Sequence, residues 1–158
     1  MIIVVDIADL AVSQDPAATL VTYSLGSCIG VAIWDPAVHV GGMLHYMLPD
    51  SQLSPDKART SPAMFADTGI PKLFRAAYEF GALKSRLVVK IAGGSQLLDD
   101  HGTFNIGKRN YLALRKIFWK NGVMIKAENV GGNISRTLRL EIGSGLVSFR
   151  SRNEEVVL

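Results

Sequence analysis

The sequence predicts an α+β fold, and two kinds of pattern indicate it. About nine short runs of apolar or alternating residues, separated by turns rich in glycine, proline and asparagine, are typical of β-strands. Two longer segments, at 66–80 and 105–121, instead have the features of helices. Many strands and few helices favour a mainly antiparallel sandwich whose helices cover one side.

The predicted strands combine β-branched and apolar residues with turn residues at their ends. They are 2–5, 8–12, 19–23, 28–34, 39–48, 87–92, 124–130, 135–142 and 146–150. The polar, proline-rich segment 49–62 is predicted to be a long loop, and 151–158 a flexible tail. With 158 residues, the chain is expected to form a single domain that spans residues 1–158.

The first helix, 66–80, is predicted from apolar residues at helical spacing. Asp67 or Thr68 is expected to cap it, which places Pro71 in the first turn, where proline is tolerated. Gly81 is expected to end the helix, because glycine readily adopts the left-handed conformation that follows a last helical turn.

The second helix, 105–121, follows a turn at Gly93-Gly94-Ser95 and is predicted to stop at Gly122. A strand, a glycine turn and a helix in this order can bind phosphate. However, the segment lacks the GxGxxG spacing and the Walker lysine and serine, and the gap before the helix is too long. We therefore expect no nucleotide and no other cofactor.

The hairpin at 28–48 contains the only cysteine of the sequence. Its turn is predicted at 35–38, and this turn pairs Cys28 with His45 across the two strands. Opposite residues of an antiparallel pair have Cβ atoms about 5 Å apart and point to the same face. The register therefore predicts that the thiol and the imidazole come within hydrogen-bonding distance, whereas a slip of one residue would separate them onto opposite faces.

Cys28 follows the turn Ser24-Leu25-Gly26-Ser27, whose backbone N–H groups have no obligatory partner. Such donors lower a thiol pKa from its usual value of about 8.5 and bind a developing oxyanion, so Gly26 and Ser27 are predicted oxyanion and positioning residues. These are the parts of a cysteine-histidine hydrolase. Two other interpretations stay open, because a lone cysteine is often a small buried apolar residue and His45, which lies among apolar residues, fits a core position.

The composition argues against several other classes of protein. A net charge of +3, with basic and acidic residues interspersed, indicates no nucleic-acid binding and suits an acidic partner. One cysteine rules out an internal disulfide, and without a cluster of Cys and His we expect no metal site. No apolar run approaches the roughly 20 residues that span a bilayer, and the first residues lack a signal-peptide pattern. We therefore expect a cytoplasmic protein that is not embedded in a membrane.

Six motifs along the chain resemble those of one family. They are TYSLGSC (22–28), HYMLP (45–49), ADT (66–68), KIAGG (90–94), NIGKRN (105–110) and GGN (131–133). In order and spacing, they are similar to the bacterial chemotaxis proteins of the CheD family, over residues 6–150. The resemblance implies a three-layer α/β/β sandwich like the catalytic domains of deamidating toxins. It also implies catalytic roles for Cys28, His45 and Thr22, with the hydroxyl or carbonyl of Thr22 orienting the imidazole.

The resemblance further implies a chemoreceptor glutamine deamidase, which hydrolyses receptor glutamine side chains to glutamate and ammonia through a cysteine thioester, with receptor methylesterase as a side activity. Its expected partners are the cytoplasmic helices of methyl-accepting chemoreceptors and a CheC-type phosphatase. Two alternatives stay open: a regulatory binding partner of that phosphatase with little catalysis, and a cysteine amidase for small molecules. Lys108, Arg109 and Asn110 match a family motif, which leaves open whether they serve structure or docking.

Overall fold

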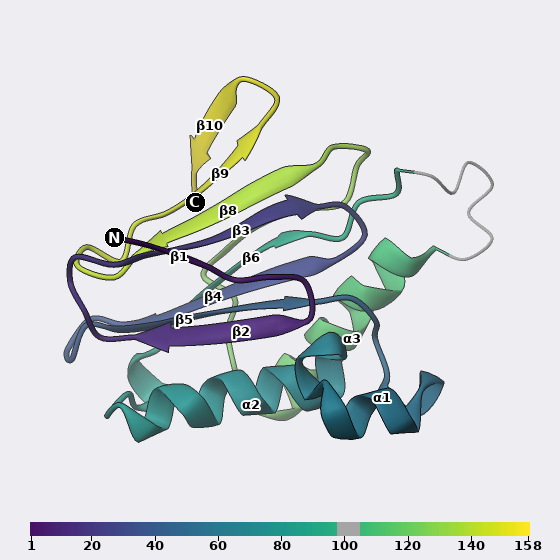
Figure 1. Ribbon diagram of the computed structural model, residues 1–158, viewed down its shortest axis with the longest axis horizontal. Coiled ribbons are helices and arrows are strands. Elements are labelled where there is room, and N and C mark those ends of the chain that lie inside the picture. Colours follow the sequence, from purple (N-terminus) through teal and green to yellow (C-terminus); the bar gives the residue numbers. More distant parts are fainter. Residues whose placement is uncertain (98–104) are drawn as a thin grey trace.

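The computed structural model describes residues 1–97 and 105–158 and shows a chain folded into three layers (Figure 1). Two five-stranded sheets lie face to face, and the helices cover the free face of one of them. We call the sheet in contact with the helices the inner sheet and the other the outer sheet. This arrangement confirms the predicted α+β class and the α/β/β layers that the family resemblance implies.

The inner sheet consists, in order across the sheet, of β2 (Asp9–Ser13), β5 (Val40–Tyr46), β4 (Ile29–Asp35), β6 (Val88–Gly93) and β7 (Ala127–Val130). The outer sheet consists of β1 (Ile2–Val4), β3 (Thr19–Leu25), β8 (Arg136–Glu141), β9 (Val147–Ser151) and β10 (Glu154–Val157). Among the described pairs, β1 with β3 and β6 with β7 are parallel, and the others are antiparallel. The helices are α1 (Pro55–Thr60), α2 (Ala66–Glu79) and α3 (Ile106–Lys120).

Alternation along β4 divides its side chains between two cores. Ile29 and Val31 belong to the core beneath the helices, whereas Ala32 belongs to the core between the sheets. The inter-sheet face also carries glycines, and a Cβ at Gly41 would lie only 2.5 Å from Ile142 Cδ1. Small residues on this face let the outer sheet approach closely, which brings polar side chains of the two sheets within contact distance.

Helix α2 starts at the predicted residue and ends one residue earlier than predicted, but its start is fixed differently. No side chain caps it, because Phe65 occupies the N-cap position. The Asp67 carboxylate instead accepts hydrogen bonds from Ser51 at 2.9 and 2.6 Å, and the Thr68 hydroxyl donates to the Pro62 carbonyl at 2.5 Å. Pro71 lies inside the helix rather than in its first turn, so both expectations at this end were wrong. Gly81 ends the helix as predicted, with φ +98°. No helix among the described residues is long and apolar enough to cross a membrane.

The segment 49–62, predicted as a long loop, contains helical turns. Ser51–Leu53 is a 3₁₀ turn, Pro55–Thr60 is α1, and a second 3₁₀ turn begins at Pro62. Proline suits the first residue of a helical turn, where no N–H is needed and φ is already helical. The two prolines therefore start helical turns here rather than breaking structure.

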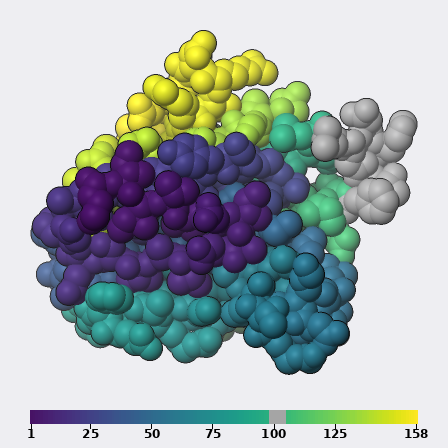
Figure 2. All heavy atoms as spheres, viewed as in Figure 1, coloured from purple at the N-terminus to yellow at the C-terminus, as the bar shows by residue number. Residues whose placement is uncertain are grey.

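The C-terminus also differs from the prediction of a flexible tail at 151–158. Strand β10 pairs with β9 from Glu154↔Ser151 to Val157↔Ser148. The backbone of Leu158 donates to the Val147 carbonyl at 2.9 Å and its own carbonyl accepts from Lys90 Nζ at 2.7 Å. The hairpin projects from the body of the molecule, as the yellow atoms in Figure 2 show, so its order depends on these few contacts.

Candidate active site

The hairpin that carries Cys28 and His45 forms, but its register lies two residues away from the predicted one. Gly30 faces His45, and Asp35 faces Val40 at the turn end. The prediction that Cys28 directly faces His45 was therefore wrong. Because the shift is an even number of residues, both side chains still lie on the inter-sheet face, one diagonal step apart.

The turn explains the shift, because it spans 36–39 rather than 35–38. Asp35 stays in the strand, where its buried carboxylate forms a 2.9 Å ion pair with Arg86 and accepts from the Leu83 N–H at 2.9 Å. His39 adopts a left-handed φ of +54°, which closes the turn one residue later. The register therefore depends on tertiary contacts of Asp35 that lie outside the hairpin.

His45 and Thr22 meet between the two sheets. Thr22 Oγ1 lies 2.6 Å from His45 Nδ1, and both residues are fully buried. The threonine hydroxyl donates its single proton to the Val5 carbonyl at 2.7 Å, so toward the ring it can only accept. The imidazole proton therefore lies on Nδ1, which leaves the lone pair on Nε2 free to act as a base.

Burial keeps both the imidazole and the thiol uncharged. Removal from water lowers the pKa of His45 to about 4, against the opposing effect of the Asp6 carboxylate. Burial also raises the pKa of the Cys28 thiol, against the effect of its own backbone N–H. Nε2 of His45 makes no hydrogen bond within the described residues, so the predicted hydrogen bond between the Cys28 thiol and this imidazole is absent there. The resting site therefore holds a neutral thiol and a neutral base rather than a thiolate-imidazolium pair.

Carbonyl groups of the turn before Cys28, and that of Cys28 itself, accept hydrogen bonds. The Gly26 carbonyl accepts from Ser95 N–H at 2.8 Å, and that of Cys28 from Gly94 N–H at 2.9 Å. The Ser27 carbonyl accepts from a side-chain amide of α3 at 3.0 Å. In the described part of the chain, no acceptor bonds the N–H of Ser27 or Cys28. The N–H groups of Ser27 and Cys28 are therefore available to a bound group, whereas the sequence predicted Gly26 and Ser27 as the oxyanion and positioning residues.

Comparison with known proteins decides the family. A family model described as CheD chemotactic sensory transduction matches residues 47–151. Two relatives are named probable chemoreceptor glutamine deamidase: CheD 1 of Syntrophus aciditrophicus, 56% identical over 149 residues, and CheD of Solibacter usitatus, 56% identical over 153. These alignments cover 94% and 97% of this chain, and 93% and 90% of the relatives. The chain belongs to the CheD family.

One solved structure is similar at a greater distance. The Neisseria meningitidis protein NMB0706, of family DUF152, has a TM-score of 0.46 and 13% identity to this CheD family member. The likeness covers 79% of this chain and 52% of that protein.

The sequence of this CheD chain did not reveal that Asn110 lies at the candidate site. It is fully buried, and its Nδ2 donates to the carbonyls of Ser27 at 3.0 Å and Met47 at 2.8 Å. A signal was present, because Asn110 shares the core-facing side of α3 with Leu114 and Phe118, at spacings of four and eight residues. Asparagine is rarely fully buried, so its position on an apolar face marks a specific hydrogen-bonding role.

The glycine turn after β6 supports the site by close packing. A Cβ at Gly93 would lie 2.2 Å from the Cys28 carbonyl oxygen, and a Cβ at Gly107 would lie 2.4 Å from the Ser95 carbonyl oxygen. The turn therefore contacts the Cys28 backbone on one side and the first turn of α3 on the other. These contacts give the strand, glycine and helix pattern a packing role.

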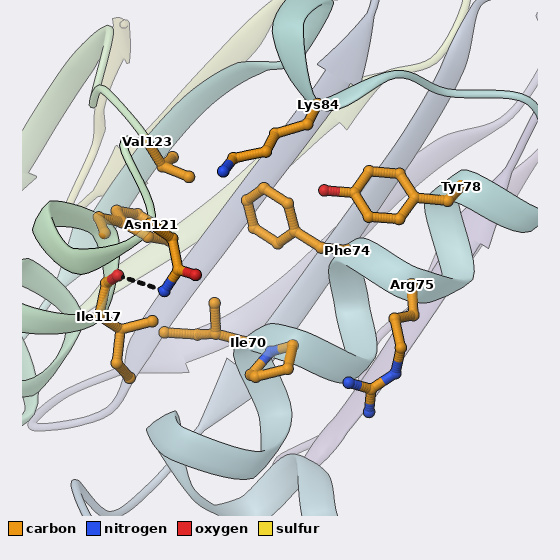
Figure 3. Close-up of a pocket in the computed structure, with 10 residues that line it drawn as sticks. Ile70, Phe74, Arg75, Tyr78, Lys84, Ile117, Asn121 and Val123 are labelled. Carbon is orange, nitrogen blue, oxygen red and sulfur yellow. Dashed lines mark hydrogen bonds between the residues drawn. The ribbon is translucent and has the colours of Figure 1, made fainter.

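A separate pocket of about 190 Å³ lies between α2 and α3 (Figure 3). Its apolar lining includes Phe74 and Tyr78 of α2, Ile117 of α3, and Val123, with Lys84 at its edge. Neither a cysteine nor a histidine is among the described residues that line it. The pocket therefore does not belong to the candidate active site.

Proposed function

We propose that this chain is a chemoreceptor glutamine deamidase that acts in the cytoplasm on glutamine side chains of receptor helices. The observation that carries the proposal is the bond between Thr22 and His45, which prepares a buried imidazole as a base on the face that also carries Cys28. The names of the relatives, which print this activity, support the same conclusion. The proposed reaction uses no cofactor.

In the first half of the reaction, Nε2 of His45 takes the thiol proton while Cys28 Sγ attacks the amide carbon of the glutamine. Because the buried imidazole is a weak base with a pKa of about 4, proton transfer and attack occur together rather than through a free ion pair. The amide oxygen becomes an oxyanion, which the N–H groups of Ser27 and Cys28 bind. One such donor typically contributes about 3–4 kcal/mol to transition-state stabilisation.

In the second half, the tetrahedral intermediate collapses and the C–N bond breaks. The imidazolium of His45 gives its proton to the leaving nitrogen, which departs as ammonia and leaves a thioester on Cys28. Nε2, neutral again, then takes a proton from water as the water oxygen attacks the thioester carbon. Breaking the C–S bond returns the proton to the sulfur, so the net reaction is amide plus water to carboxylic acid plus ammonia.

Receptor cytoplasmic fragments and the Cys28→Ala variant test the proposal. Mass spectrometry of the fragments is expected to show the glutamine-to-glutamate mass change with the wild type and none with Cys28→Ala. Circular dichroism of the variant checks that its fold is intact. Deamidation that persists with the folded variant would refute the assignment of Cys28 as the nucleophile.

The same site is expected to accept a receptor glutamyl methyl ester, with methanol as the leaving group in place of ammonia. The other predicted role, binding to a CheC-type phosphatase, is measured on the same variant by titration with the purified phosphatase. Retained binding together with lost deamidation assigns Cys28 to catalysis alone. Loss of both assigns the turn to a shared surface.

A further inference from the structure

The peptide unit between Ser27 and Cys28 joins the nucleophile to helix α3. A trans peptide is planar, so its carbonyl and its N–H point in opposite directions, and the described chain contains no cis peptide bond. Asn110 Nδ2 donates to the Ser27 carbonyl at 3.0 Å. By holding the oxygen of this peptide on the α3 side, Asn110 directs the N–H of Cys28 to the opposite side.

The N–H of Cys28 lies beside the sulfur of the proposed nucleophile. It has no backbone acceptor within the described residues, and its interaction with its own sulfur lowers the thiol pKa. The preceding peptide is held in the same way, because Ser95 N–H binds the Gly26 carbonyl at 2.8 Å and so directs the N–H of Ser27. Both peptides are thus oriented by hydrogen bonds to their carbonyls, on the side opposite their N–H groups.

The side chain of Asn110 is committed to this task. Its second donated bond, 2.8 Å to the Met47 carbonyl, reaches the segment that follows His45, so one amide connects the turn of the nucleophile to the strand of the base. Its Oδ1 is buried without a partner among the described residues. A buried unsatisfied acceptor costs about 1–3 kcal/mol, and the amide keeps this orientation because both of its protons are in use.

We propose that Asn110 is a positioning residue that orients the Ser27–Cys28 peptide, so that the Cys28 N–H binds the oxyanion of the substrate. Asn110 does not touch the substrate and acts through the peptide alone. A bond to the carbonyl also polarises the peptide, which makes its N–H a stronger donor. The inference rests on the proposed deamidase function, because it concerns the transition state of that reaction.

Two reactions of the same thiol test the inference. Deamidation passes through an oxyanion, whereas alkylation by iodoacetamide displaces iodide at a saturated carbon and forms none. We expect Asn110→Ala to lower kcat for deamidation by roughly 100-fold, with KM changed less than about threefold. The rate constant of the Cys28 thiolate for alkylation, taken from the plateau of the pH profile and followed by mass spectrometry, is expected to stay within about twofold of the wild type, because it does not depend on the thiol pKa that the Cys28 N–H lowers.

Asn121→Ala is the matched control. Asn121 ends the same helix, and its Nδ2 also donates to a backbone carbonyl, that of Ile117 at 2.8 Å, but it is exposed and contacts no residue of the turn. This variant is expected to keep both rates. If Asn110→Ala does not fold, Asn110→Ser, which retains a hydroxyl donor and leaves a smaller cavity, is measured in the same way.

The outcomes separate the two proposals. Equal losses in deamidation and alkylation would reduce Asn110 to a structural residue and overturn the inference. An unchanged kcat in the folded Asn110→Ala variant would also overturn the inference. Absence of glutamine turnover by the wild type, by contrast, would refute the proposed function, whatever the Asn110 variants do.

Discussion

At the scale of single residues, Thr22 determines which nitrogen of His45 carries the proton. Its hydroxyl donates its proton to the Val5 carbonyl and accepts from Nδ1–H, which leaves the lone pair on Nε2, the proposed base. Thr22→Val keeps the shape and removes the hydroxyl. We expect kcat/KM for deamidation to fall by roughly 100-fold, because the ring can then take the other tautomer or turn.

The same substitution leaves two buried polar groups without a partner, so the free energy of unfolding is expected to fall by about 1–3 kcal/mol. Thr22→Ser restores the hydroxyl and is the matched control, which is expected to recover most of the activity. Nitrogen NMR of the imidazole reports the tautomer directly. A Val variant with wild-type kinetics would show that the hydroxyl has no part in positioning the base.

At the scale of secondary-structure elements, α3 has two different faces. Its buried face carries Asn110, whereas its seven exposed residues comprise five cations, a leucine and a tryptophan and include no acid. They are Lys108, Arg109, Leu112, Arg115, Lys116, Trp119 and Lys120. Five of the seventeen basic residues of the sequence therefore share one exposed helix surface, which begins with Lys108 and Arg109 beside Asn110. This placement favours docking of an acidic substrate surface.

We expect the double charge reversal Lys108→Glu, Arg109→Glu to raise KM for receptor fragments by roughly tenfold and to leave kcat nearly unchanged. Acidic residues in the first turn of a helix suit its dipole, so weaker binding would not reflect a weaker helix. The salt dependence of KM is also expected to decrease. Arg150→Glu, on β9 of the outer sheet, is the control, and an equal rise in KM there would contradict a docking role for α3.

The hairpin shows how far the sequence predicts an element. Hydrophobic alternation predicts the two strands and the common face of Cys28 and His45, because any even shift of register preserves the face. The turn position was misjudged, because the buried ion pair between Asp35 and Arg86 holds Asp35 in the strand. The contact between Thr22 and His45 joins two sheets, so no local pattern predicts it, and only the family resemblance implied it. The bonds of Asn110 span more than sixty positions and were missed for the same reason.

At the scale of the whole molecule, the site lies between two sheets rather than on a surface loop. The glycines of the inter-sheet face allow the outer sheet to approach, and this approach buries His45 completely. The layered fold therefore sets the chemistry, because removal from water lowers the pKa of His45. Asp35 is also buried, but hydrogen bonds from Arg86 and from backbone N–H groups outweigh the effect of burial and lower its pKa below 3.8.

These two groups predict how stability changes with pH. The pKa of His45 is about 4 in the folded chain and near 6.5 in the unfolded chain, so protons bind the unfolded chain more tightly. The stability that depends on the neutral imidazole is present above about pH 6.5 and is lost as the pH falls toward 4, by about 3 kcal/mol in all. Asp35 loses its contribution to stability only below pH 3.8, outside this range.

Urea unfolding at steps from about pH 7 to about pH 4 measures the loss of stability, and His45→Gln, which does not titrate, is expected to show a flatter profile. Parallel profiles for the two proteins would mean that His45 is protonated without unfolding, and hence that water reaches the space between the sheets.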